Sequence, residues 1–218
     1  MSVRRSLTPL ALATILAAPP ARAEKETFVF DKNHTQITFR IRHFVTKVGG
    51  RFTKFDGTIT LDREKPAESS VELKIESASI DTGVPARDKD LNSTNFFDTA
   101  TYPEIAFKST RIVPKGGDSY EVTGDLTMHG VTKPVTLTVT SNGFAGDGRG
   151  GQKAGFDVAG RLNRKDFGVS WNRIVDQSPM LGDDVDLLIT VEANKPGPKP
   201  AAPPAPPAAA APPAPASK

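Results

Sequence analysis

The sequence predicts an all-β protein in which an antiparallel sheet of about eight strands closes into a barrel. Apolar residues recur at every second position along much of the chain, most clearly at Ile37, Phe39 and Ile41, and this spacing is typical of half-buried strands. Short polar and glycine-containing stretches separate these segments, which indicates turns between antiparallel neighbours. A sheet with one apolar face and two edges protects both by closing on itself.

Both ends of the chain fall outside this pattern. Residues 1–23 have a basic start, an apolar stretch and the small-x-small sequence Ala21-Arg22-Ala23, which is typical of a cleaved secretory signal peptide. Residues 195–218 are almost wholly proline, alanine and lysine and predict a disordered tail. We therefore expect a signal peptide at 1–23, one barrel domain at 24–194 and a Pro/Ala-rich tail at 195–218. The leader, together with the lack of cysteine, predicts export to the periplasm.

Composition excludes several functions. The net charge is +3, but residues 24–194 hold 22 basic residues against all 25 acidic ones, so the basic excess belongs to the ends and predicts no nucleic-acid groove. With no cysteine, the chain has no disulfide, thiolate nucleophile or Cys-rich zinc site. Twelve phenylalanines stand beside one tryptophan and two tyrosines, which suits a dry core or a pocket for a hydrocarbon.

Nine segments with strand character follow one another along the barrel domain, at residues 27–31, 35–44, 50–61, 71–79, 104–113, 119–128, 135–141, 155–163 and 185–192. The alternation stops after Ile80, where Pro85–Ser93 is expected to form a short helix that carries Leu91. This long connection, Gly83–Phe97, has apolar residues of its own, and we expect it to cover one end of the barrel in part.

A second irregular stretch, residues 163–182, contains the only tryptophan. It begins with a charged turn, Asn163–Gly168, which we expect a contact between Arg164 and Asp166 to hold. No serine lies in Gly-x-Ser-x-Gly or Ser-x-x-Lys spacing, so the sequence does not indicate acyl-enzyme chemistry.

Short motifs run in order through residues 27–193, and they are Asp31-x-x-His34, Phe39-x-x-x-His43, Gly50-x-Phe52, Gly57-x-Ile59-x-Leu61-Asp62, Ala78-Ser79-Ile80-x-Thr82-Gly83, Arg87-Asp88-x-x-Leu91, Asn95-Phe96-Phe97-Asp98, Tyr102-Pro103-x-Ile105-x-Phe107, the run from Gly124 to Pro134, and Asn163-Arg164-x-Asp166-Phe167-Gly168. In these motifs the sequence resembles the YceI-like family. The resemblance implies a lipocalin-like β-barrel, mostly periplasmic in that family, that binds a long isoprenoid chain such as a polyprenyl lipid or a quinone tail. The Pro/Ala-rich tail lies outside the family pattern.

If the barrel encloses a ligand, its contacts come from the apolar face of the sheet and from polar groups at the mouth. Burial of a hydrocarbon chain contributes about 0.8 kcal/mol per CH₂, which is sufficient for micromolar affinity without a charged contact. The predicted ligand-binding residues are Ile37, Phe39, Ile41, His43, Phe52, Leu73, Arg87, Leu91, Phe96, Phe107, Leu126 and Phe156.

The polar candidates leave alternatives open. The three histidines lack the paired spacing of metal ligands, so no metal site is predicted. His34 either bonds to the backbone or Asp31, or contacts the ligand. His43 shares the face of Ile41 near a strand end, and its role at the mouth stays undecided between head-group contact and none. Arg87 either ties the helix to a neighbouring loop or meets a phosphate or quinone oxygen.

The sequence predicts a carrier without catalytic residues or a cofactor, which binds a long-chain isoprenoid lipid in its lumen for periplasmic transport or storage. One alternative is a small enzyme acting on such a lipid, with His43 and Arg87 as polar groups at the mouth. Another is an envelope interaction protein with a filled core, whose tail binds a partner in extended polyproline form. The oligomeric state is not predicted.

Overall fold

The structure is a computed structural model, and it describes residues 24–197. The expected signal peptide and most of the expected tail lie outside these residues. The elements are β1 (Glu26–Phe30), β2 (Gln36–His43), β3 (Thr46–Phe52), β4 (Phe55–Leu61), η1 (Pro66–Glu68), β5 (Ser70–Glu76), η2 (Ser77–Ser79), β6 (Ile80–Asp81), α1 (Pro85–Leu91), β7 (Glu104–Gly116), β8 (Ser119–Met128), β9 (Val131–Gly146), β10 (Gln152–Asn163), η3 (Arg164–Phe167), β11 (Ile174–Val175), β12 (Ser178–Pro179) and β13 (Leu181–Lys195).

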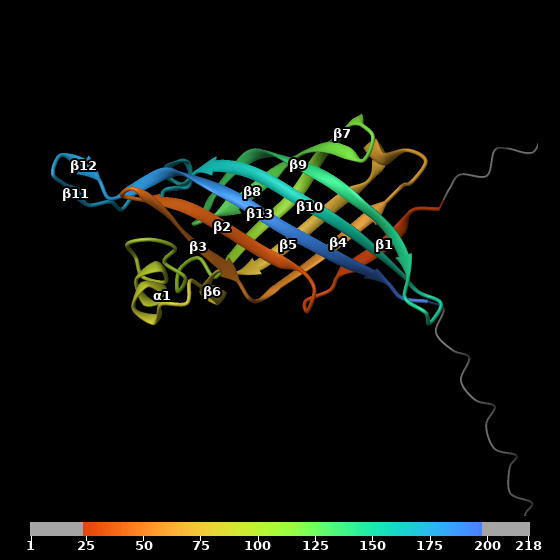
Figure 1. Cartoon of the computed structure of the whole chain (residues 1–218), viewed down its shortest axis with the longest axis horizontal. Coiled ribbons are helices and arrows are strands. Elements are labelled where there is room, and N and C mark those ends of the chain that lie inside the picture. The colour runs from red at the N-terminus through yellow and green to blue at the C-terminus, as the bar shows by residue number, and fades with distance from the viewer. Residues whose placement is uncertain (1–23, 198–218) are drawn as a thin grey trace, which may run out of the picture.

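The main sheet closes into an antiparallel barrel of eight strands, which confirms the predicted fold class (Figure 1). The closed ring runs β1-β4-β5-β7-β8-β9-β10-β13, and the pairing of β1 with β13 completes it. Consecutive strands from β7 to β10 are neighbours in the sheet, as their short turns predict. Closure leaves the apolar face of the sheet on the inside, where water is excluded.

The first strands of the barrel are bent. β1 and β2 lie end to end along the same edge of β13, with Phe30 opposite Ala193 and Ile37 opposite Ile189. Between them the backbone N–H of Asp31 donates to the carbonyl of Glu192 over 2.8 Å. The segments expected at 27–31 and 35–44 are therefore two arms of one bent strand. β3 and β4, and likewise β5 and β6, continue each other in the same way.

A second cluster of core side chains lies at one end of the barrel. A small cluster of Phe96, Val169 and Leu181 is buried there, and Leu91 of α1 packs against it. The helix α1, over Pro85–Leu91, confirms the short helix expected between residues 85 and 93. No helix within residues 24–197 has the length and apolar character needed to cross a membrane.

The contact expected between Arg164 and Asp166 is not formed. Arg164 is only 4% exposed, and its guanidinium donates to the carbonyls of Gly182, Val169 and Trp171 at 2.7–2.9 Å. The carbonyls of Val169 and Trp171 lie in irregular backbone, and that of Gly182 lies where the register of β13 against β2 shifts, so a buried donor satisfies them. The carboxylate beside Arg164 is that of Asp183, whereas Asp166 pairs with Lys133 at the surface.

Candidate ligand-binding cavity

A cavity of about 300 Å³ lies inside the barrel. Volumes of this order are typical of sites for small molecules. All eight strands of the ring contribute, β1 through Phe30 alone, and nearly all of the lining is apolar. The apolar lining residues are Phe30, Ile37, Phe39, Phe52, Ile59, Leu61, Pro66, Val71, Leu73, Ile75, Ile105, Phe107, Ile112, Val122, Leu126, Met128, Val135, Leu137, Val139, Phe144, Phe156, Val158, Leu162, Leu187, Ile189 and Val191.

Most polar lining residues gather at one end of the barrel, which we call the mouth. The connection between β4 and β5, with the first residue of β5, contributes Asp62, Arg63, Ser69 and Ser70. The C-terminal half of β9 contributes Ser141. The two termini of the described chain lie at this end, and α1 lies at the other (Figure 1). Lining residues at the mouth, such as Arg63 and Phe144, are exposed to solvent, whereas no residue of α1 or of the small cluster around Phe96 lines the cavity; the cavity therefore opens at the mouth.

The mouth has a turn with its own hydrogen bonds. Asp62 is 4% exposed, and its Oδ1 accepts from the backbone N–H of Lys65 over 2.8 Å and of Glu64 over 3.1 Å. The hydroxyl oxygen of Ser69 accepts from the backbone N–H of Asp62 over 2.9 Å. These bonds satisfy a buried carboxylate and hold the β4–β5 connection in place.

Glycines on neighbouring strands make room for the aromatic rings of the lining. A Cβ atom placed at Gly50 would lie 2.6 Å from the ring of Phe39, its partner across the β2–β3 pair. A Cβ atom at Gly124 of β8 would likewise collide with the ring of Phe107 on β7. These rings occupy the space next to the glycines, and a side chain at either position would displace them.

Seven of the twelve predicted ligand-binding residues line the cavity, and they are Ile37, Phe39, Phe52, Leu73, Phe107, Leu126 and Phe156. The other five do not line it, and they are Ile41, His43, Arg87, Leu91 and Phe96. Contact of the first group with a ligand stays a prediction.

The five residues outside the lining lie at the closed end. Ile41 and Leu91 pack on the small cluster around Phe96, whose ring lies 5.1 Å from that of Trp171. Sequence alternation places Ile41 on the inner face correctly, but it does not say that this stretch of β2 runs past the cavity. The connection Gly83–Phe97 thus covers the end of the barrel opposite the mouth.

Two predicted polar contacts also lie away from the mouth. Arg87 donates from Nε to Oγ1 of Thr82 over 2.8 Å and from Nη2 to the Thr82 carbonyl over 2.9 Å, while the Thr82 N–H donates to Asp88. This is the structural alternative for Arg87, in which it ties the helix to the preceding loop. His43 ends β2, and its ring packs edge-on against Phe44 at 4.9 Å.

Sequence reasoning missed the residues of the mouth itself. Arg63 lies in a connection with no periodic pattern. Phe144 lies in the glycine-rich stretch that the sequence assigned to a hairpin tip, whereas β9 continues to Gly146. The sequence held one signal that β9 is longer, a single phenylalanine among glycines. Its apolar ring can be removed from water only if the strand continues past these glycines.

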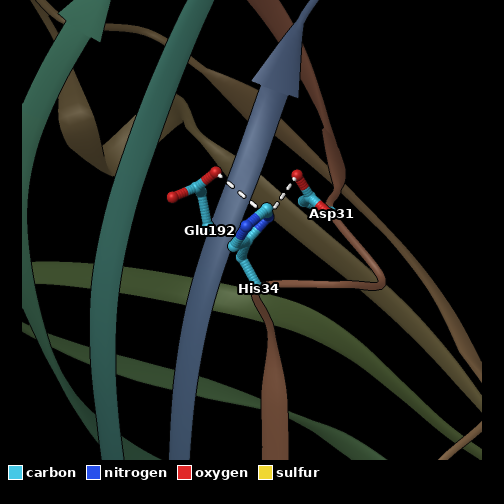
Figure 2. A group of neighbouring side chains, drawn as sticks. All are labelled: Asp31, His34 and Glu192. Carbon is cyan, nitrogen blue, oxygen red and sulfur yellow. Dashed lines mark hydrogen bonds and ion pairs between the residues drawn. The ribbon is translucent and has the colours of Figure 1, made fainter.

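His34 forms a polar cluster with Asp31 and Glu192 on the outside of the barrel (Figure 2). Its Nδ1 lies 2.9 Å from Oδ2 of Asp31 and 3.7 Å from Oε1 of Glu192. Lys153 pairs with Glu192 and lies 3.8 Å from Asp31. These side chains are of metal-ligand types, but the Lys153 ammonium already supplies a positive charge to both carboxylates. We assign the cluster a structural role.

The cluster joins the bend between β1 and β2 to β13. Asp31 accepts hydrogen bonds from His34, from Nδ2 of Asn194 and from the backbone N–H of Asn33, and these hold the pKa of its carboxyl well below the usual range. His34 was expected either to bond to the backbone or Asp31, or to contact the ligand. The structure shows the hydrogen bond to Asp31.

Comparison with known proteins identifies the family of this barrel. A sequence profile of the YceI-like domain matches residues 28–193, which is almost the whole described chain. The chain belongs to the YceI-like family. Among YceI-like relatives, Protein YceI of Escherichia coli O157:H7 is 40% identical over 192 residues, which are 87% of this chain and 97% of the relative. A UPF0312 protein of Pseudomonas syringae pv. tomato is 39% identical over 193 residues, with the same coverage of 87% and 97%.

Several solved structures have a fold similar to that of this YceI-like barrel. BcnA of Burkholderia cenocepacia has a TM-score of 0.67 and 29% identity, over 75% of this chain and 98% of its own. The Campylobacter jejuni YceI protein has a TM-score of 0.61 and 30% identity, over 71% and 89%. A polyisoprenoid binding domain from Saccharophagus degradans shares the fold, with a TM-score of 0.54 and 14% identity over 79% and 100%.

Proposed function

We propose that this YceI-like barrel binds one long-chain isoprenoid lipid, of polyprenyl or quinone type, and shields it from water for transport or storage. The observation that carries the proposal is the apolar cavity of about 300 Å³ that ends in a polar mouth. This change from an apolar interior to a polar mouth matches an amphiphile with a hydrocarbon chain and a polar head group. The binding of a polyisoprenoid by the Saccharophagus degradans domain of the same fold supports the choice of ligand class.

The size of the barrel supports a slender ligand. An eight-stranded barrel is just wide enough to hold one small or narrow molecule between its side chains. Each buried CH₂ contributes about 0.8 kcal/mol, so an isoprenoid chain binds through the hydrocarbon walls alone. The head group then stays at the mouth, near the hydroxyls of Ser69, Ser70 and Ser141.

We further propose that this carrier works in the periplasm. The support is the signal-peptide pattern of residues 1–23, which lies outside the described residues. Fractionation of the native host, with detection of a chain that begins at Glu24, tests this proposal.

The alternatives receive less support from the geometry. The enzyme hypothesis needed His43 and Arg87 at the mouth, and both lie at the closed end. The hypothesis of an interaction protein needed a filled core, whereas the barrel holds a cavity; its tail lies mostly outside the described residues. We therefore put forward the carrier alone.

The experiment is mass spectrometry of the full chain, purified from its native host under non-denaturing conditions. We expect one isoprenoid lipid per protein, and we expect Phe107→Asp to lose it, because an unpaired carboxylate in an apolar cavity is costly. Leu126→Asn, which places a similar-sized amide in the same lining, is a milder second variant.

The matched control is Val29→Asp, since Val29 is 49% exposed on the outer face of β1. This control should retain the lipid. Two results would refute binding in the lumen. In the first, the purified wild type carries no lipid and takes up no added polyprenol. In the second, folded Phe107→Asp and Leu126→Asn proteins keep the same lipid.

A further inference from the structure

Arg63 and Phe144 meet at the mouth of the cavity. The guanidinium carbon of Arg63 lies 3.9 Å from the centroid of the Phe144 ring, a cation–π contact. Arg63 comes from the β4–β5 connection and Phe144 from the end of β9. In the ring of strands, β1, β13 and β10 separate β4 from β9, so the contact joins distant parts of the rim. Both side chains also line the cavity.

Two polar partners hold Arg63 in this position, and a third residue holds one of them. Its Nε forms an ion pair with Glu26 on β1, and its Nη2 donates to Oε1 of Gln152 on β10 over 2.6 Å. Lys195, the last residue of β13, donates to the other carboxylate oxygen of Glu26 over 2.6 Å. Glu26 does not line the cavity, so it is a positioning residue for Arg63.

Phe144 packs on one aromatic ring of the core and stays partly exposed. Its ring centroid lies 6.1 Å from that of the fully buried Phe28, and its strand partner is the small Ala154. The side chain nevertheless stays 43% exposed, more than the other phenylalanines of the lining. The ring therefore has a buried neighbour in Phe28 and a partly exposed neighbour in Arg63.

We propose that Arg63 and Phe144 form a gate over the mouth, which opens when a ligand enters and when it leaves. The inference rests on the proposed function, because a gate acts only on a cavity that takes up a ligand. Opening breaks a cation–π contact and an ion pair at a partly exposed site, and both are weak enough to break often. The gate therefore controls rates and leaves affinity to the apolar walls.

The test uses retinol, an isoprenoid alcohol with a neutral head group whose fluorescence reports an apolar environment. Stopped-flow mixing gives the association rate constant, and transfer to phosphatidylcholine vesicles gives the dissociation rate constant. For Arg63→Gln we expect both constants to rise together by about tenfold, the change that loss of one such contact implies, with Kd unchanged. Glu26→Gln, which touches neither ligand nor cavity, should raise both constants in the same direction.

The control is Lys108→Gln, which removes a cation paired with Glu72 over 2.8 Å on the outer face of the sheet. It should leave both rate constants unchanged. If wild type, Arg63→Gln and Glu26→Gln all bind retinol saturably with the same rate constants, the gate proposal is wrong and the carrier proposal stands. A change in Kd through dissociation alone would also overturn it, because Arg63 would then be a ligand contact. Failure of the wild type to bind either retinol or a polyprenol would overturn the carrier and the gate together.

Discussion

Glycine and phenylalanine occupy complementary positions in the barrel wall. The rings of Phe39 and Phe107 lie where a Cβ at Gly50 or Gly124 would collide with them. A larger residue at either glycine pushes a ring toward the centre and fills the space left for a ligand. The two glycines therefore help to keep the space inside the barrel.

Asp31 is the residue for which the structure predicts a pH dependence. Its pKa is lowered below 3.8 by hydrogen bonds from His34, Asn194 and the Asn33 N–H. A lowered pKa stabilises the folded state above the unfolded-state pKa, and this stabilisation declines as the pH falls toward the folded-state pKa. We expect Asp31→Asn to lower the free energy of unfolding by roughly 1–3 kcal/mol at pH 7. The loss should be smaller at pH 3.

Urea unfolding at the two pH values measures this difference. His34 and Lys153 face the carboxylate of Asp31, and Glu192 pairs with Lys153; the Asp31→Asn variant keeps all three residues. The control is Asp56→Asn, because Asp56 is 77% exposed beside Lys32 and its ion pair is solvated. Its stability should match that of the wild type. An equal loss at pH 7 and pH 3 in Asp31→Asn would show that Asp31 acts through packing, and its charge would then be unimportant.

Among the elements, the connections at the two ends of the barrel have different tasks. The Gly83–Phe97 segment, with α1, packs over the closed end through Leu91 and Phe96. The β4–β5 connection lines the mouth through Asp62, Arg63, Ser69 and Ser70. The length of the first connection and its own apolar residues predicted that it covers one end of the barrel in part, but they did not indicate which end holds the mouth.

Hydrogen exchange distinguishes these two connections. When retinol is added, we expect exchange to slow in residues 62–70 and 141–146, because the ligand orders the mouth that it contacts. Residues 83–97 should change less, since their apolar side chains are already packed at the other end. Slower exchange confined to residues 83–97 would mean that the ligand enters past α1.

At the scale of the whole molecule, both described termini meet at the mouth. Lys195 ends β13 and bonds to Glu26 at the start of β1, so the seam of the barrel is tied beside the opening. A chain that follows Lys195 therefore starts next to the mouth. The barrel needs nothing beyond this seam for closure, because the pairing of β1 with β13 is complete before residue 197.

Removal of residues 198–218 tests that independence. We expect the shortened chain to keep its Tm within a few degrees and its affinity for retinol, since the removed segment has no aromatic or β-branched residue to bury. Thermal unfolding followed by circular dichroism and a retinol titration measure the two properties. A larger fall in Tm would assign the tail a place on the barrel.

The sequence alone determined the class of this fold and the character of its interior. Alternation at positions such as Ile37 and Phe39 defines a strand and its apolar face, because side-chain direction in a strand depends only on position. The many phenylalanines, with few tyrosines and tryptophans, make that interior dry. Both properties are local and can be read along the chain.

The tertiary structure decided which end of the barrel is open and which side chains meet there. Arg63 and Phe144 are 81 residues apart, and their contact depends on strand order and on the position of each strand along the barrel axis. Alternation specifies the face of Ile41 but not its height, so it could not show that Ile41 lies past the cavity. Long-range register sets that height, and no local pattern of residues contains it.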